Sequence, residues 1–374
     1  MNNKNSPSVN RFRLGRFFER AEEGSCLTIA FLGGSITQGS LATKEKNTYA
    51  ARVFHWYEET FPDSVFSYIN RGVGGTDSFF GTARAAGDVL SAWPDMVFVD
   101  FSVNDPADDL HRETYEGLLR CILKGPSCPA VAALGNARYD DGTTAEDIHR
   151  PLCEYYGIPY VSVKDRILPL IQSGAYRRQD LSPDGLHPND TGHRLIADAV
   201  TEVLQAYRGI REKVVSALPA PMTADAFEGA QILRARGGGR SSLLSEAGER
   251  EWVAVCHGFL PDPLPRTAFR DFFREGWEGS SVGDTIRFDL PPCTNIGIQY
   301  RRTIHRPAPK AMVQLDDREV LELDGNFDED WGDCLALEPV LFHGERMRHT
   351  LTLTLSEAPE DCVSSFYLLG ILFA

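Results

Sequence analysis

The chain has 374 residues, enough for two domains, and its 42% apolar and 24% charged residues are typical of a protein with a packed core. Its formal net charge of −15 argues against nucleic acid and anionic membranes as partners, because both would repel it. No run of about eighteen apolar residues predicts a transmembrane span, and the polar segment 1–9 lacks a signal-peptide pattern. We therefore expect a cytoplasmic protein with no membrane partner. Its eight cysteines show no Cys-x-x-Cys pair or Cys/His cluster of metal-ligand spacing.

From Leu27 to about Tyr207, short apolar runs alternate with segments of helical pattern. The predicted strands are 27–32, 64–69, 96–101, 130–134 and 159–163. The predicted helices are 48–59, 83–92, 115–124, 148–156 and 192–205, preceded by a short amphipathic helix within 11–24. This alternation predicts an α/β domain with a parallel sheet covered on both faces and ligands bound at the carboxyl ends of the strands.

The pattern changes after about Arg208, where a segment rich in proline and alanine leads to the glycines of 237–239. Beyond it, short alternating runs are separated by Gly, Pro and Asp turns, including TIRFDL, IGIQYRR, AMVQLD, HTLTLTLSE and SSFYLLGILFA. Such runs predict an antiparallel β-sandwich or jelly roll. We therefore expect one domain over 1–210, a linker over 211–240 and an all-β domain over 241–374.

Residues 27–39 (LTIAFLGGSITQG) join the first predicted strand to a polar segment that can begin a helix. Gly33 and Gly34 permit a tight turn that would lift Ser35 clear of the sheet and place it at a helix N-terminus. Backbone N–H groups there favour a nucleophile whose reaction develops negative charge. The alternative is a phosphate-binding loop, but 36–38 lacks Lys-Ser or Lys-Thr and the glycine spacing does not match a dinucleotide fingerprint.

Three further turns at predicted strand ends carry residues that complement a serine nucleophile. Asp184 and His187 precede a predicted helix, at a spacing that lets the carboxylate reach imidazole Nδ1 and leaves Nε2 for Ser35. Asn104 offers a side-chain N–H and Gly75 a backbone N–H, which with the amide of Ser35 make three donors for an oxyanion. Each feature alone is common, because an Asn-Asp pair usually caps a helix or turn and a His before Pro is usually structural.

Together these turns resemble the four sequence blocks of the SGNH (GDSL-type) hydrolases, in the family's order. The blocks are GGSIT at 33–37, the glycine-rich turn 70–76, SVND at 102–105 and DGLH at 184–187. The resemblance implies a flavodoxin-like three-layer α/β/α hydrolase domain and a serine esterase that needs no metal or other cofactor. It implies Ser35 as nucleophile, His187 as base, Asp184 as its orienting partner, and an oxyanion hole made by Ser35, Gly75 and Asn104.

Two positions depart from the family pattern. Gly34 stands where many members carry Asp, and Ser102 stands where the third block usually has Gly. Neither position supplies a catalytic atom, so both concern the subfamily rather than the mechanism. Gly74 and Gly75 are adjacent, and the count from the start of the turn favours Gly75 as the donor. His193, on the helix after the fourth block, is expected to be structural.

The layout resembles two-domain bacterial carbohydrate O-acetylesterases, whose C-terminal jelly roll is similar to a carbohydrate-binding module. We therefore expect an acetylated oligosaccharide substrate derived from mannan or xylan. A lipid or thioester acylhydrolase of the lysophospholipase type is the alternative within the family. A glycan-binding protein without catalytic activity is the alternative from another class. The exposed edges of a jelly roll would serve a homodimer as readily as a sugar.

Within the second domain, the segment 325–333 (GNFDEDWGD) presents one tryptophan among acidic residues. We expect this loop to lean over the Ser35 site, where the indole of Trp331 would stack on the apolar face of a sugar ring. Two alternatives stay open. Trp331 packs in the β core beside a solvated acidic turn, or the carboxylates of 324–333 bind calcium, although their spacing matches no calcium motif.

Overall fold

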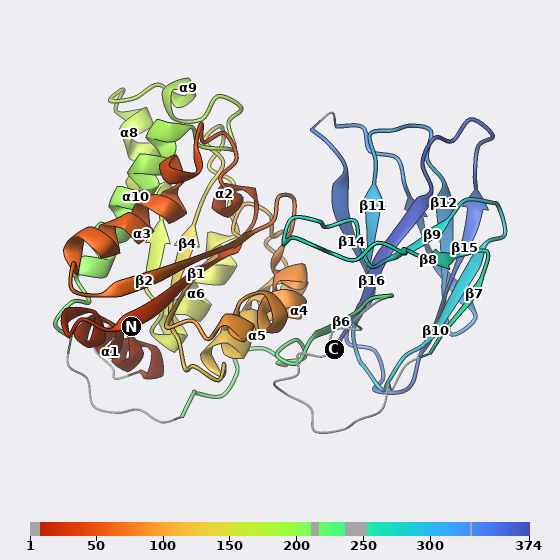
Figure 1. Cartoon of the computed structure of the whole chain (residues 1–374), viewed down its shortest axis with the longest axis horizontal. Helices are drawn as coiled ribbons and strands as arrows, with labels where there is room; N and C mark the ends of the chain where they lie inside the picture. Colours follow the sequence, from red (N-terminus) through yellow and green to blue (C-terminus); the bar gives the residue numbers. More distant parts are fainter. Residues whose placement is uncertain (1–7, 211–216, 236–252, 330) are drawn as a thin grey trace. The chain divides into compact units, whose positions relative to one another are not determined.

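The computed structural model describes residues 8–210, 217–235, 253–329 and 331–374. The chain forms two compact units that divide between Glu228 and Gly229 (Figure 1). Within the described ranges, no helix is both long enough and apolar enough to cross a membrane.

The first unit is built on a five-stranded parallel sheet of order β2-β1-β3-β4-β5. Its strands are β1 (Cys26–Gly33), β2 (Val65–Gly72), β3 (Met96–Asp100), β4 (Ala130–Gly135) and β5 (Tyr160–Ser162). The central strands are almost wholly buried, as expected for a parallel sheet with both faces covered. This strand order is that of the flavodoxin-like α/β folds, so the predicted fold class of this unit is confirmed.

Helices cover both faces of the sheet (Figure 1). Because side chains alternate along a strand, Ile29 and Phe31 of β1 join one core, whereas Ala30 and Leu32 join the other. The first core is closed by α1 (Val9–Glu22), α3 (Tyr49–Thr60) and α10 (Asp190–Gln205), and the second by α4 (Ser78–Asp88), α5 (Asp109–Leu123) and α6 (Glu146–Tyr156). Shorter segments complete the connections: α2 (Ser35–Gln38), η1 (Glu45–Asn47), η2 (Leu90–Ala92), α7 (Val163–Arg166), α8 (Leu168–Gln172) and α9 (Arg178–Leu181).

Part of the segment predicted as a linker is packed. The buried carboxylate of Glu116 on α5 accepts hydrogen bonds from the backbone N–H groups of Met222 and Thr223, both at 2.7 Å. Phe227 is buried edge-on against Phe79, with ring centroids 5.5 Å apart. The described residues 217–228 therefore belong to the first unit, while residues 211–216 and 236–240 of the predicted linker lie outside the described residues.

The second unit is a β-sandwich, as predicted. One sheet has the order β13-β12-β15-β10-β7 and the other β14-β11-β16-β9-β8, with β6 paired to β16. The strands are β6 (Gln231–Leu233), β7 (Val253–His257), β8 (Leu260–Pro261), β9 (Trp277–Gly279), β10 (Thr285–Asp289), β11 (Ile296–Arg302), β12 (Lys310–Leu315), β13 (Arg318–Asp324), β14 (Cys334–Leu341), β15 (Thr350–Glu357) and β16 (Phe366–Phe373). Alternate residues of β10, β12 and β15 enter one apolar core, because the other face of that sheet meets solvent.

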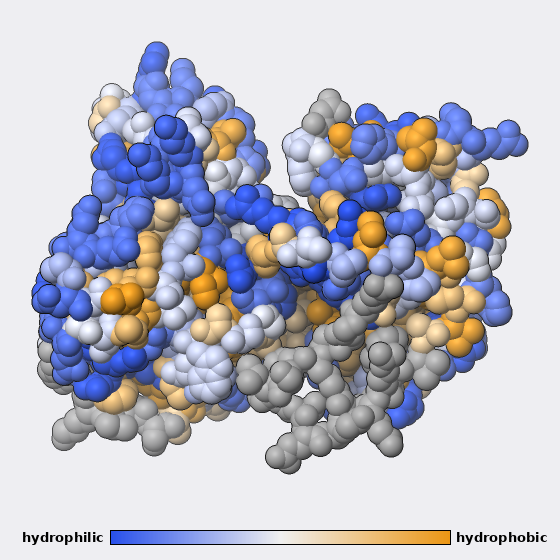
Figure 2. Space-filling view, viewed as in Figure 1, coloured by the Kyte–Doolittle hydropathy of each residue, from blue (hydrophilic) through white to orange (hydrophobic). Residues whose placement is uncertain are grey.

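The visible surface of each unit is mainly hydrophilic, with hydrophobic residues in small separate patches (Figure 2). Scattered exposed apolar residues are normal on globular folds. Hydropathy on this face therefore marks no binding surface.

Candidate active site

The structure brings Ser35, His187 and Asp184 into one hydrogen-bonded chain. His187 Nε2 lies 2.9 Å from Ser35 Oγ, and His187 Nδ1 lies 2.7 Å from Asp184 Oδ2. Because an ionised carboxylate only accepts, Nδ1–H donates to Asp184, which leaves Nε2 to accept from the serine hydroxyl. Ser35 follows β1 at the carboxyl edge of the sheet and is 8% exposed, so its side chain is largely buried.

Ser35 is the first residue of α2, a helix of four residues that ends at Gly39, where φ is 102°. One turn of helix carries little dipole, so the local backbone N–H groups rather than a long helix face the nucleophile. The turn that carries Ser35 packs closely against neighbouring segments at two glycines, where there is no room for a side chain. A β-carbon at Gly33 would collide with Thr37 Oγ1, and one at Gly72 of β2 would collide with the backbone of Gln38.

Asp184 and His187 are fixed within one tight turn. Asp184 Oδ1 accepts from the backbone N–H groups of Leu186 and His187, at 2.9 and 2.7 Å. Burial acts to raise the pKa of Asp184, but the hydrogen bonds from the His187 side chain and from these two backbone groups outweigh it and lower the pKa below the ordinary value. The carboxylate is therefore ionised at neutral pH and holds the imidazole in the tautomer that a base requires.

The predicted oxyanion donors lie around the same turn. Gly74 donates its N–H to Gln38 Oε1 at 2.6 Å, which leaves Gly75, with φ of 71°, as the glycine whose N–H is not used within the described chain. A β-carbon at Gly74 would lie 3.7 Å from Ser35 Cβ, so this turn borders the serine. Asn104 lies close to the same turn, where its side chain contacts Gly34. The geometry therefore groups Gly75 and Asn104 beside Ser35.

A buried polar cluster beneath the serine turn was not predicted. Asp100, the last residue of β3, accepts hydrogen bonds from Thr37 Oγ1 at 3.2 Å and from Asn136 Nδ2 at 2.8 Å. Thr37 Oγ1 also lies 2.7 Å from Tyr49 Oη. Burial raises the pKa of Asp100 to about 7. The available sequence signal is a polar residue that ends an otherwise apolar strand, as Asp100 does in MVFVD.

His193 has a structural position, as expected. Its Nδ1 accepts the backbone N–H of Tyr49 at 3.2 Å, and its Nε2 lies 3.2 Å from the carbonyl oxygen of Ser40. Burial lowers its pKa to about 4, so at neutral pH it is uncharged and links α3 to the loop after α2.

In the second unit, Trp331 is 55% exposed, so the alternative that places it in the β core is wrong. Its indole N–H donates to Glu329 at 2.7 Å, and its ring meets Phe327 edge-on with centroids 5.0 Å apart. The neighbouring carboxylates have protein partners, since Asp328 pairs with Arg306 and Asp333 accepts from Thr303 Oγ1 at 2.7 Å. Among the described residues, no group of His, Cys, Asp or Glu side chains has a metal-binding arrangement.

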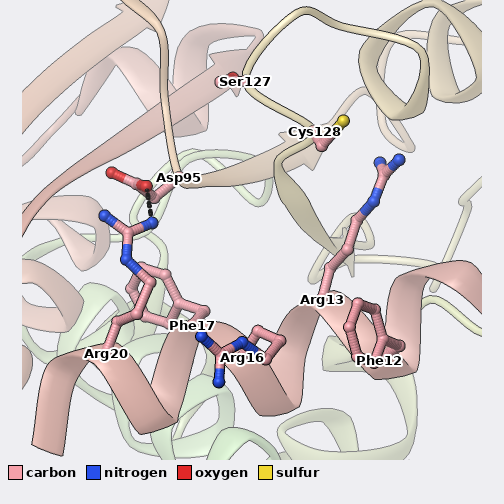
Figure 3. Close-up of a pocket in the computed structure, with 8 residues that line it drawn as sticks. All are labelled: Phe12, Arg13, Arg16, Phe17, Arg20, Asp95, Ser127 and Cys128. Atoms are coloured by element: carbon pink, nitrogen blue, oxygen red, sulfur yellow. Dashed lines mark hydrogen bonds and ion pairs between the residues drawn. The ribbon is translucent and has the colours of Figure 1, made fainter. Parts of the chain in front are cut away.

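A cavity of about 340 Å³ lies at the opposite, amino edge of the sheet (Figure 3). It is lined by Phe12, Arg13, Arg16, Phe17 and Arg20 of α1 together with Asp95, Ser127 and Cys128. Arg20 pairs with Asp95, and Arg13 donates to the carbonyl oxygen of Leu123 at 2.6 Å. None of the predicted site residues lines this cavity, and its cations are already engaged.

Comparisons with known proteins agree with this geometry. Residues 31–195 match the GDSL-like lipase/acylhydrolase family. A crystal structure of a two-domain esterase (CEX) active on acetylated mannans is 38% identical, with a TM-score of 0.89, over 99% of this chain and 98% of that one. The same esterase co-crystallized with mannopentaose matches equally, at 38% identity and a TM-score of 0.89 over 99% and 97% of the two chains.

This chain belongs to the GDSL-like lipase/acylhydrolase family, as the sequence blocks predicted. It is therefore an esterase or acylhydrolase of the SGNH type. An acetyl xylan esterase, AlAXEase, is a more distant match at 21% identity and a TM-score of 0.42, over 47% of this chain and 98% of that one. A comparison with curated protein sequences found no match.

Proposed function

We propose that this esterase removes O-acetyl groups from acetylated oligosaccharides derived from mannan, with Ser35 as the nucleophile. The proposal for the reaction rests on one observation above all, the continuous Ser35–His187–Asp184 hydrogen-bond chain. The proposal for the substrate is supported by the 38% identity, over nearly the full length of both chains, to an esterase active on acetylated mannans.

In the proposed reaction, Ser35 Oγ attacks the acetyl carbonyl while His187 Nε2 takes the hydroxyl proton. Ionised Asp184 stabilises the imidazolium that forms. The negative charge on the carbonyl oxygen is stabilised by N–H groups of Ser35, Gly75 and Asn104, and each such donor typically contributes about 10²- to 10³-fold to the rate.

His187 next returns the proton to the departing sugar oxygen, which leaves an acetyl group on Ser35. The same histidine then takes a proton from water, whose oxygen attacks the acetyl-enzyme. Acetate is released when the tetrahedral species collapses and the proton returns to Ser35.

We also propose that Trp331 contributes to holding the oligosaccharide. Its indole is exposed, is held edge-on by Phe327, and has its N–H fixed by Glu329, so it presents a preorganised apolar face. Such a face suits the C–H side of a sugar ring. This role is independent of the hydrolytic step.

The deciding measurement is acetate release from acetylated mannan oligosaccharides and acetylated xylan oligosaccharides, beside p-nitrophenyl acetate and butyrate, for the wild type and Ser35→Ala. We expect release from the mannan substrate that requires Ser35, with little turnover of butyrate. Turnover of the chromogenic esters alone would keep the serine mechanism and remove the mannan assignment. Faster turnover of butyrate or longer esters would favour a lipid or thioester substrate. Binding of the glycan without any hydrolysis would favour the glycan-binding alternative.

A further inference from the structure

A second aspartate–histidine pair lies buried behind Asn104. The side chains of Asp105 and His149 are both 0% exposed, and Asp105 Oδ2 lies 2.9 Å from His149 Nε2. Because the carboxylate oxygen Oδ2 is the acceptor, Nε2–H donates to Asp105. The imidazole of His149 stacks on Tyr115 of α5, with ring centroids 3.6 Å apart and planes 9° apart. The ring therefore has a fixed position in which its N–H points at the carboxylate.

The other oxygen of Asp105 contacts a second segment. Oδ1 accepts the backbone N–H of Ser78 at 2.8 Å, and Ser78 is the first residue of α4, three residues after Gly75. One buried carboxylate thus joins the loop after β3, the start of α4 and the first turns of α6. A further bond between the same segments runs from the N–H of Ala145, just before α6, to the carbonyl oxygen of Ser102 at 2.7 Å.

Asn104 itself has little to hold it. Its side-chain amide makes no hydrogen bond to the described part of the chain, although Oδ1 is buried. Its backbone N–H donates to the carbonyl oxygen of Phe101 at 3.0 Å, and so does that of Asp105 at 2.9 Å. The position of the Asn104 amide therefore depends on its loop, which the adjacent residue, Asp105, anchors to α4 and α6.

From these contacts we infer that Asp105 and His149 are positioning residues, which hold Asn104 where its amide can donate to the oxyanion. This inference rests on the proposed function and deepens it. His149 touches no reacting atom and acts only through Asp105. Loss of the Nε2–H donor would leave Oδ2 of this buried carboxylate without its hydrogen bond, and the loop that carries Asn104 would shift to let water reach it.

Two substitutions separate the donor from the ring. His149→Phe keeps the stacking on Tyr115 and removes the N–H, whereas His149→Gln keeps an N–H donor and loses the ring. For p-nitrophenyl acetate we expect His149→Phe to lower kcat by about 30-fold with less than about a 3-fold change in KM, and His149→Gln to retain kcat within about 5-fold. Tyr115→Phe is the control, because it keeps the stacking and removes only a hydroxyl that contacts Cys153 Sγ at 3.8 Å.

The decisive step is a double-mutant cycle with Asn104→Ala. If His149 acts through Asn104, His149→Phe should cost less than about 3-fold in kcat once Asn104 is absent. Equal losses in both backgrounds would overturn the inference, because a merely structural histidine would act independently of Asn104. If His149→Phe does not fold, as judged by thermal unfolding, the cycle is run with Asp105→Asn under the same criterion. If the wild type shows activity that requires Ser35 but the losses in the cycle are additive, this inference is wrong and the proposed function stands. A wild type inactive on every ester refutes the proposed function and the inference with it.

Discussion

The side chain of Asn104 lies directly against Gly34, the residue that precedes Ser35. A β-carbon at Gly34 would collide with Asn104 Oδ1 and lie 3.2 Å from its Cγ. Glycine at this position is a departure from the family pattern, in which many members carry Asp. The contact with Asn104 gives a physical reason for glycine at position 34 in this chain, because a side chain there would push the Asn104 amide away from the serine turn.

We therefore expect Gly34→Ala to lower kcat for p-nitrophenyl acetate by about 10- to 100-fold, approaching the loss of one oxyanion donor. KM should change little, because the donor acts mainly on the charged intermediate. Gly87→Ala is the matched control: Gly87 lies in α4 with open space around a new β-carbon, so its activity should equal that of the wild type. Wild-type kcat in Gly34→Ala would contradict a role for the contact.

The Ser35–His187–Asp184 hydrogen-bond chain predicts strongly non-additive losses of kcat. Ser35→Ala and His187→Ala should each reduce kcat by about 10⁴-fold or more, and the double variant should lose less than about 3-fold beyond either single variant. Asp184→Asn should cost less, since it disturbs the tautomer without removing the base. Steady-state rates with p-nitrophenyl acetate measure all four. A double variant whose losses multiply would show that the serine and histidine work independently.

Asp100 predicts a pH-dependent stability. Burial raises its pKa to about 7 in the folded chain, above the value of about 3.9 for an unfolded aspartate. Between about pH 4 and pH 7 the folded state keeps a proton that the unfolded state has released, so rising pH removes stability across this window. Asp100→Asn cannot ionise but keeps an oxygen for Thr37 and Asn136, so it should remove this decline.

The measurement is the free energy of unfolding by urea at several pH values. We expect stability to fall with pH more steeply in the wild type than in Asp100→Asn, with a difference on the order of 1–4 kcal/mol over the window. Asp198→Asn, at an exposed carboxylate, is the control and should follow the wild type. Parallel curves for Asp100→Asn and the wild type would mean that Asp100 is ionised in the folded state throughout.

Trp331 predicts an effect restricted to long substrates. Trp331→Ala should raise KM for acetylated mannan oligosaccharides by about 3- to 10-fold, the range of one aromatic contact, and leave KM for p-nitrophenyl acetate unchanged. Trp93→Ala offers a matched control, because Trp93 is 56% exposed and Trp331 is 55% exposed. Equal effects of Trp331→Ala on both substrates would remove the sugar-stacking role.

Much of the first unit could be predicted because its signals are local. The apolar run 27–32 ends at two glycines, and the structure extends this strand by only one residue at each end. The motif turns are also local signals. Asp184 and His187, for example, both lie in the single block 184–187. Only their approach to Ser35 required the fold, because the 184–187 turn follows α9 rather than a strand of the sheet.

Two helix starts were placed too late. Helix α4 was predicted over 83–92 but begins at Ser78, after Asp77, whose side chain accepts the N–H of Phe80 at 2.9 Å. Helix α5 was predicted over 115–124 but begins at Asp109, capped in the same way by Asp108. In both cases polar residues in the first turns are buried by tertiary contacts, so the apolar periodicity understates the helix.

The cluster around Asp100 and the pair of Asp105 and His149 could not be read from the sequence. Asp100 meets Asn136 across 36 residues, and Asp105 meets His149 across 44 residues, with no spacing pattern that links them. The one-turn helices between Val163 and Leu181 were missed for a related reason. Segments so short are held by tertiary contacts rather than by their own propensity.

Asp184 and His187 are joined through a single turn, whereas His187 reaches Ser35 across 152 residues. Asp184 and His187 should therefore move together, and a displacement of their loop breaks the bond to Ser35 but not the bond between them. We therefore expect agents that disturb this loop to break the His187–Ser35 bond in some molecules. The fraction of active molecules should fall, while the turnover of each molecule that keeps the bond stays the same.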